Sequence, residues 1–286
     1  MLGRTGHRHT AISDFRRSQG VAMAAQLNRL WRLIGTMLGF TLFGIGCLLL
    51  TLVWFPLLWL FVRGETRRHL AQSTIRISFR FFLNVLRQLR VLDYRFHNMP
   101  QQLSGVLVLA NHPSLLDYVL LAAYMPECDC IVKEALWHNP FVAGIVRAAG
   151  YIPNAAAEAL LPVCCERLQQ GAVLLVFPEG TRTTPGEPLQ LHRGAAHLAV
   201  RCQAKLQPVR IHCSAPFLTK QHKWFHVPEH KPLFTVEFLP QSEARNLIPH
   251  EEAPSLAARH LTHYFKRVLS PAQSAPVWTQ DATNIN

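Results

Sequence analysis

The sequence predicts an α/β fold with a mixed, largely parallel sheet flanked by helices, preceded by a membrane-anchoring helix or helical hairpin. Two observations support this prediction. Residues 33–62 contain no charged side chain, and beyond residue 100 short apolar runs alternate with helical stretches. An uncharged helix longer than roughly 20 residues can cross a hydrocarbon core. Alternation of strands and helices is typical of α/β domains.

The composition favours contact with lipid. Hydrophobic residues make up 49% of the 286 residues and charged residues 16%, so the chain is more apolar than a typical soluble enzyme. The formal net charge of +12 attracts polyanions. No helix-turn-helix, zinc-finger or RNA-binding signature accompanies the basic residues. We therefore expect membrane lipids as partners and no nucleic acid.

The N-terminal part divides into a basic arm and a membrane segment. Residues 1–32 are rich in arginine and are expected to form a poorly ordered or surface-lying arm. Residues 33–62 are too long for a signal-peptide core, and no clear cleavage site follows them. Pro56 interrupts this segment, so a single span and a re-entrant hairpin both stay open. Arg63 and Arg67 make the second flank positive too, and the positive-inside rule therefore gives no orientation.

Residues 63–98 are predicted to be an amphipathic helical region. Between Ile75 and Leu89 apolar residues recur at helical spacing beside a stripe of arginines. The apolar stripe can pack on the protein core, or the helix can lie on anionic lipid.

Residues 99–270 are predicted to form the catalytic domain, with a C-terminal helix near residues 256–268 and a disordered tail at residues 271–286. Strands are expected where short apolar runs occur, at residues 105–110, 129–132, 172–177, 206–211 and 233–239.

Seven cysteines occur without a C-x-x-C pair or regular zinc spacing. Cys128, Cys130 and nearby His138 offer too few ligands for a zinc site, so no metal is predicted. We expect the cysteines to be reduced and mostly buried thiols.

The run VLVLANHPSLLDYVLL places His112 after an apolar strand and Asp117 five residues later. Pro113 is favoured at the first helical position, so we expect the helix to begin near it. Within one helix, His112 and Asp117 would lie about 140° apart around the axis, too far to pair. Pairing therefore requires His112 to precede the helix. A carboxylate-held imidazole can act as a general base that activates an acceptor hydroxyl.

A second run, AVLLVFPEGTRT, carries polar residues directly after another apolar strand. Ends of strands are where α/β sheets build their sites. Gly180 would allow a tight turn close to a ligand, and Arg182 could make paired hydrogen bonds to a phosphate. Glu179 could orient Arg182 or an acceptor hydroxyl.

Together, these two motifs resemble the lysophospholipid acyltransferase family, also called the glycerophosphate acyltransferase or PlsC-like family, over residues 75–240. The resemblance implies that His112 and Asp117 form the catalytic dyad of an H-x-x-x-x-D block. Arg193 stands where the family often has a basic residue before glycine, whereas Asn154 replaces an arginine that contacts phosphate. The F-P-E-G-T-R block implies acceptor binding by Glu179, Gly180, Thr181 and Arg182.

The resemblance implies a membrane-bound O-acyltransferase of phospholipid biosynthesis. Such an enzyme moves a fatty acyl chain from acyl carrier protein or coenzyme A to a lysophospholipid such as 1-acyl-glycerol-3-phosphate, without a cofactor. It also implies the bacterial inner membrane, with the catalytic domain facing the cytoplasm. Residues 112–141 resemble a branch found with aryl-polyene lipid biosynthesis, which leaves another lipid hydroxyl as an alternative acceptor.

Two other functional classes are open alternatives. A serine esterase could use Ser114 beside His112, although the sequence has no G-x-S-x-G elbow. A non-enzymatic membrane protein that binds anionic lipid fits the composition equally well. Turnover of a labelled acyl thioester separates this second alternative from an acyltransferase.

Overall fold

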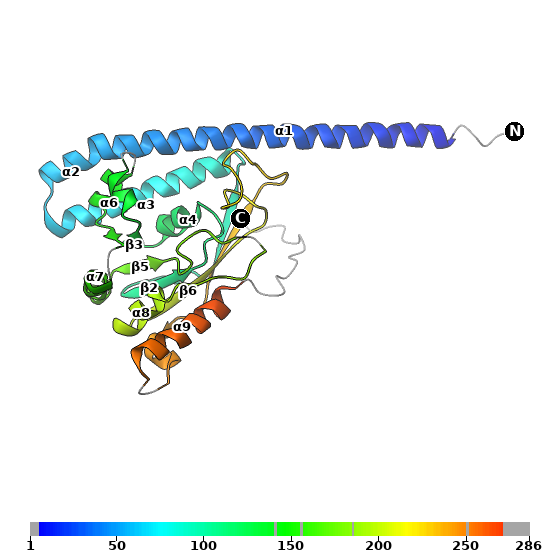
Figure 1. Ribbon diagram of the computed structural model, residues 1–286. Coiled ribbons are helices and arrows are strands. Elements are labelled where there is room, and N and C mark those ends of the chain that lie inside the picture. Colours follow the sequence, from blue (N-terminus) through cyan, green and yellow to red (C-terminus); the bar gives the residue numbers. More distant parts are fainter. Residues whose placement is uncertain (1–5, 140–141, 155–156, 185, 250–251, 271–286) are drawn as a thin grey trace.

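The computed structural model describes residues 6–139, 142–154, 157–184, 186–249 and 252–270. Figure 1 shows a central sheet with helices on both faces and a long N-terminal helix that runs along one side of the molecule. The predicted mixed α/β fold is confirmed. The predicted tail at residues 271–286 lies outside the described residues.

Within the described residues, eight strands form one sheet in the order β1-β7-β6-β2-β5-β3-β4, with β8 beside β6. Strand β6 is antiparallel to β7 and β8, and the other pairs are parallel. The five predicted runs correspond to β2 (Val106–Ala110), β3 (Cys128–Val132), β5 (Val173–Val176), β6 (Lys205–Cys213) and β7 (Leu233–Phe238). The other strands are β1 (Asp93–His97), β4 (Ile152–Pro153) and β8 (Ser242–Glu243).

The two faces of the sheet are covered by different helices, so central strand β2 is buried on both sides. Val108 belongs to a core shared with α3 (Gly64–Gln88) and α4 (Asp117–Tyr124), whereas Leu107 belongs to a second core under α8 (Gly194–Arg201) and α9 (Pro254–Leu269). The remaining short elements are α5 (Ala135–His138), α6 (Ala143–Ala148), α7 (Ala157–Gln169) and the 3-10 turn Ala244–Leu247.

The N-terminal helix is longer than the predicted membrane segment. Helix α1 (Gly6–Leu49) continues through a π-helical turn, Leu50–Trp54, into α2 (Phe55–Phe61). The arm that was expected to be poorly ordered or surface-lying is helical from Gly6 onward. Pro56 does not break the rod, because it lies in the first turn of α2, where proline fits. The hairpin forms instead between this rod and α3, which returns alongside it (Figure 1).

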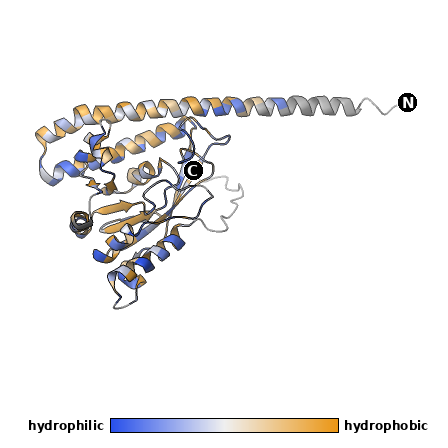
Figure 2. Ribbon diagram, in the orientation of Figure 1, coloured by the Kyte–Doolittle hydropathy of each residue, from blue (hydrophilic) through white to orange (hydrophobic). Residues whose placement is uncertain are grey.

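The rod exposes much of its apolar surface. Its stretch Met23–Phe61 is long and apolar enough to cross a membrane, and only 17% of the most apolar window is buried. A core helix of a soluble protein would be mostly buried instead. Figure 2 shows hydrophobic residues along α1 and α2. At Gly39, α1 approaches α3 so closely that an added Cβ would lie 2.6 Å from Leu86 Cδ2.

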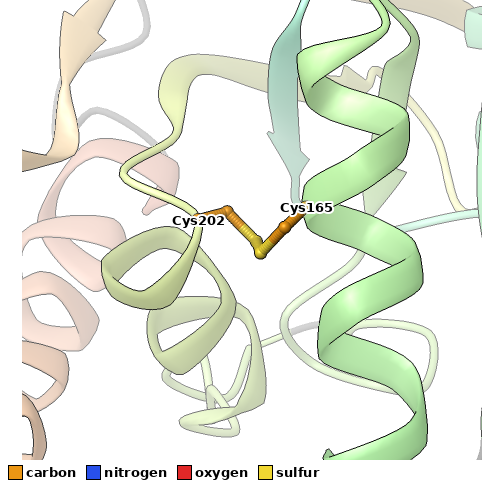
Figure 3. Close-up of a disulfide and its surroundings, with 2 residues drawn as sticks. All are labelled: Cys165 and Cys202. Atoms are coloured by element: carbon orange, nitrogen blue, oxygen red, sulfur yellow. A yellow bond between two sulfur atoms is a disulfide. The ribbon is translucent and has the colours of Figure 1, made fainter.

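The expectation that every cysteine is a reduced thiol is wrong. Cys165 of α7 and Cys202, at the end of α8, form a disulfide, although all cysteines were expected to be reduced (Figure 3). The other five are free thiols, and four of these are buried. Burial raises the pKa of the Cys164 thiol to about 11, which keeps it protonated and unreactive near neutral pH.

Candidate active site

The loop after β2 is fixed to the neighbouring strand before it reaches His112. The Asn111 amide donates to the Ile211 carbonyl at 2.8 Å and accepts from the Ile211 N–H at 2.7 Å. Because these two bonds continue the pairing between β2 and β6, the backbone that enters His112 has a defined position. Helix α4 then begins at Asp117 rather than near Pro113 as expected. His112 precedes the helix, as pairing requires.

His112 and Asp117 form a direct pair. The His112 Nδ1 and Asp117 Oδ2 atoms are 2.9 Å apart, and the same oxygen accepts the Ser114 N–H at 2.7 Å. The imidazole stacks on Phe177 with 4.2 Å between ring centroids. A neutral imidazole that donates through Nδ1 keeps Nε2 free to accept a proton. This arrangement suits a general base.

The Asp117 carboxylate is fully buried, which disfavours its charged form. Burial raises the pKa of Asp117 to about 6, against the opposing effect of the hydrogen bond from His112 and the N–H of Ser114. Asp117 is therefore ionised at neutral pH and becomes protonated below about pH 6.

Glu179 connects the second motif to the first. Its Oε1 atom accepts the His112 N–H at 3.0 Å and the Thr183 hydroxyl at 2.7 Å. The Thr183 N–H donates to the His112 carbonyl at 2.7 Å. Because β2 and β5 are adjacent and parallel, the two motifs meet at one edge of the sheet. The buried Glu179 side chain thus orients residues 111–116, which carry His112 and are called the catalytic loop below. Its predicted contact with the acceptor stays a prediction, since Glu179 also lines the cavity described below.

This arrangement predicts different effects for two substitutions of Glu179. Glutamine keeps an oxygen that can accept from both His112 and Thr183, so Glu179→Gln should retain most of kcat. Glu179→Ala removes the acceptor and should lower kcat about 100-fold, the loss typical of a catalytic group displaced by about 1 Å. Steady-state kinetics on both variants tests this. Equal losses would mean that the charge of Glu179 acts directly on substrate.

Arg182 holds a second segment against the catalytic loop. Its Nη1 atom donates to the carbonyls of Leu218 and Thr219, both at 2.9 Å. Leu218 has a φ of +53°, which is uncommon for a residue other than glycine. Its carbonyl also accepts the Leu115 N–H at 3.1 Å. These bonds fix the segment, so Arg182 has a positioning role besides the expected phosphate contact.

Gly180 makes the tight turn that the sequence predicted. Its φ is +63°, in the left-handed region that favours glycine. A Cβ there would also lie 3.1 Å from the His192 ring.

A polar cavity of about 290 Å³ opens beside Glu179. Thr181 and Arg182, which were predicted to bind the acceptor, line it, and Lys220 adds a cation that no sequence motif indicates. Arg193 is exposed at the start of α8 and is absent from the lining, which includes its neighbour His192 instead. The lining residues are Glu179, Thr181, Arg182, Thr183, Thr184, Glu187, Pro188, Gln190, Leu191, His192 and Lys220.

Ser114 does not have the surroundings of a nucleophile. Its side chain is fully buried, and its hydroxyl donates to the Phe217 carbonyl at 2.9 Å. The hydroxyl also accepts the Leu116 N–H at 3.3 Å. These contacts stabilise the catalytic loop and argue against the serine esterase alternative.

Comparison with known proteins gives matches over the part of the chain that contains this site. Residues 92–212 match the family model described as Acyltransferase, and this range contains the dyad and both motifs. The chain is 38% identical over 110 residues to the 1-acyl-sn-glycerol-3-phosphate acyltransferase of Helicobacter pylori, covering 36% of this chain and 46% of the relative. It is 32% identical over 157 residues to the alpha form from Mus musculus, covering 52% and 54%. The matches thus span about half the length of these relatives.

The fold has a solved counterpart. The structure resembles the crystal structure of the 1-acyl-sn-glycerophosphate acyltransferase PlsC from Thermotoga maritima, with a TM-score of 0.61 and 19% identity. The match covers 85% of this chain and 100% of that one. The matched family model thus indicates an acyltransferase domain over residues 92–212. Over this part the chain is similar to the PlsC-like lysophospholipid acyltransferases.

Proposed function

We propose that this protein transfers a fatty acyl chain from a thioester of acyl carrier protein or coenzyme A to the hydroxyl of 1-acyl-glycerol-3-phosphate. The observation that supports this most is the pairing of His112 with buried Asp117 beside a polar cavity that Arg182 and Lys220 line. The curated relatives described above are named for the same acceptor.

His112 Nε2 takes the proton of the acceptor hydroxyl as its oxygen attacks the thioester carbonyl. The carbon–sulfur bond then breaks, and the proton passes from His112 to the departing thiolate. Ionised Asp117 stabilises the imidazolium while it carries this proton. The residues need no metal or other cofactor for these steps.

The cavity binds the acceptor phosphate. Arg182 and Lys220 supply charge-assisted hydrogen bonds, and the exposed Thr181 hydroxyl can donate a further one. Asn154 is exposed at the end of β4 and does not line the cavity. Lys220 can therefore provide the positive charge that, in the family this sequence resembles, comes from an arginine at the position of Asn154. Arg193, outside the lining, adds positive charge next to His192.

The protein acts at a membrane surface. Exposed apolar side chains on the hairpin of α1, α2 and α3 fit a lipid environment better than water, among them Met37, Leu60, Phe61, Ile77 and Phe81. We place the catalytic domain on the cytoplasmic side of the bacterial inner membrane, where acyl carrier protein and coenzyme A thioesters are available.

Purified full-length protein in detergent should convert labelled acyl thioester and 1-acyl-glycerol-3-phosphate to phosphatidate. A monoacylglycerol, which has the hydroxyl but no phosphate, should react poorly. Preference for monoacylglycerol or another uncharged lipid hydroxyl would favour the alternative acceptor class. Membrane binding without turnover of any acceptor would favour the non-enzymatic alternative.

Lys220→Gln should raise KM for 1-acyl-glycerol-3-phosphate about 10-fold with little change in kcat. The loss corresponds to one charge-assisted hydrogen bond that the substrate makes before and during reaction. Lys266→Gln, on exposed α9 across the sheet, is the matched control and should leave KM unchanged. An unchanged KM in Lys220→Gln would remove Lys220 from the acceptor site.

A further inference from the structure

The segment between Leu218 and β7 carries two exposed aromatic side chains. Trp224 is 46% exposed and Phe225 is 52% exposed. Large aromatic residues side by side on a surface are costly in water and often mark an interaction site. We call residues 222–226 the aromatic loop.

The aromatic loop and its neighbours are attached to the apolar helix α1 at two points. The rings of Trp224 and Phe40 pack in a T-shaped arrangement with 6.1 Å between centroids. Buried Arg32 donates through Nη2 to the carbonyls of Pro228, at 2.9 Å, and Glu229. Since Arg32 and Phe40 are separated by about two helical turns, the segment runs beside α1 instead of projecting away from it. Figure 1 shows this gold segment next to α1.

Apolar side chains of α1 are exposed at the same level of the helix as the two attachment points, namely Trp31, Ile34 and Met37. Trp224 and Phe225 add a second exposed apolar region beside α1. Tryptophan is favoured at the depth of lipid headgroups, because its ring is apolar and its N–H is polar.

The charge of the loop favours an anionic surface. Lys223 is exposed and lies 5.7 Å from the centre of the Phe225 ring. Among the described residues, Lys223 takes part in no ion pair, whereas nearby Lys231 is paired with Asp93 at 3.1 Å. A lysine next to inserted aromatic rings is attracted to anionic lipid headgroups.

We propose that the aromatic loop docks onto an anionic phospholipid surface, with Trp224 and Phe225 inserted at headgroup depth and Lys223 among the headgroups. The proposal rests on the membrane association proposed above and adds a second contact to that of the apolar hairpin. The loop follows the Leu218–Thr219 segment held by Arg182, and Lys220 between them lines the cavity. The docked loop would therefore place the cavity at the membrane surface, where the acceptor lies.

Fluorescence quenching by lipids brominated near the headgroup measures this contact without requiring activity. The full-length protein is reconstituted into phosphatidylcholine vesicles with and without phosphatidylglycerol. The Trp224 signal is the difference between the wild type and Trp224→Phe. The signal of Trp59, 69% exposed on α2, is obtained in the same way and is the control for the hairpin.

We expect quenching of the Trp224 signal that is stronger with phosphatidylglycerol, and quenching of the Trp59 signal in both vesicles. Lys223→Gln should raise the phosphatidylglycerol content needed for half-maximal quenching of Trp224 about fivefold. Lys266→Gln should not change it. Quenching of Trp59 without quenching of Trp224 would overturn the loop proposal while leaving the membrane association intact. Quenching of neither would overturn both.

Concentration-dependent shielding of Trp224 in detergent, without lipid quenching in vesicles, would instead indicate that a second copy of the chain covers the loop. The proposed acyl transfer is measured separately, in detergent with a short-chain soluble acceptor. Trp224→Ala with Phe225→Ala should retain that activity, since neither residue lines the cavity. If the wild-type protein shows no acyl transfer, the proposed function is contradicted but the lipid contact is not.

Discussion

His112→Ala is expected to lower kcat for acyl transfer by roughly 10²- to 10⁴-fold, the range that a general base contributes. The ring that would accept the hydroxyl proton is lost, while the loop around it keeps its backbone bonds to Glu179 and Thr183. Transfer of labelled acyl chains from a thioester in detergent measures the loss.

His263→Ala is the matched control for this variant. His263 is exposed on α9, across the sheet from the dyad, and its removal should leave kcat unchanged. Both variants should bind vesicles like the wild type, because the apolar hairpin is intact. Wild-type turnover in His112→Ala would contradict the assignment of His112 as the base. A Ser114→Ala variant with a loss as large as that of His112→Ala would reopen the esterase alternative.

Asp117→Asn is expected to cause a loss of about 10³- to 10⁴-fold, as in other sites where a buried carboxylate holds a catalytic histidine. The amide is similar in size but cannot stabilise the imidazolium, and it can favour the wrong tautomer of His112. The control is the far-ultraviolet circular dichroism spectrum, which should match that of the wild type. Near-normal activity in Asp117→Asn would show that the contact with His112 is only structural.

The same residue predicts how activity depends on pH. Because the pKa of Asp117 is raised to about 6, its carboxylate is charged above that pH and neutral below it. The kcat of the wild type should therefore fall as the pH decreases through about 6. The residual kcat of Asp117→Asn should not show the decrease that protonation of this carboxylate causes near pH 6.

Part of the fold was predictable because the central strands β2 and β5 are continuously apolar. Strand β2 is buried along its whole length, and its short run of aliphatic residues is typical of a strand covered on both faces. Strand β1 was not predicted, because it lies at the edge of the sheet and alternates polar residues such as Asp93 and Arg95 with apolar ones. The predicted helical region ran to residue 98, so the start of a strand at Asp93 was not recognised.

The dyad was predictable because its two residues are close in sequence, and the geometric condition on His112 could be stated in advance. The role of Glu179 was not, since its partner His112 is 67 residues away and belongs to another strand end. Lys220 is a single lysine in a loop, and only the folding of that loop against Arg182 brings it to the cavity. Long-range contacts of this kind leave no local periodicity.

While it is oxidised, the disulfide between Cys165 and Cys202 restricts the unfolded chain. The two cysteines are 37 residues apart, and the segment between them contains β5, the Phe177 to Arg182 block and α8. Closing a loop of this length removes conformations from the unfolded ensemble and is worth about 3 to 4 kcal/mol of stability in the chain-entropy model. The Phe177 to Arg182 block therefore has fewer unfolded states available than the catalytic loop that it supports, which lies outside the closed segment.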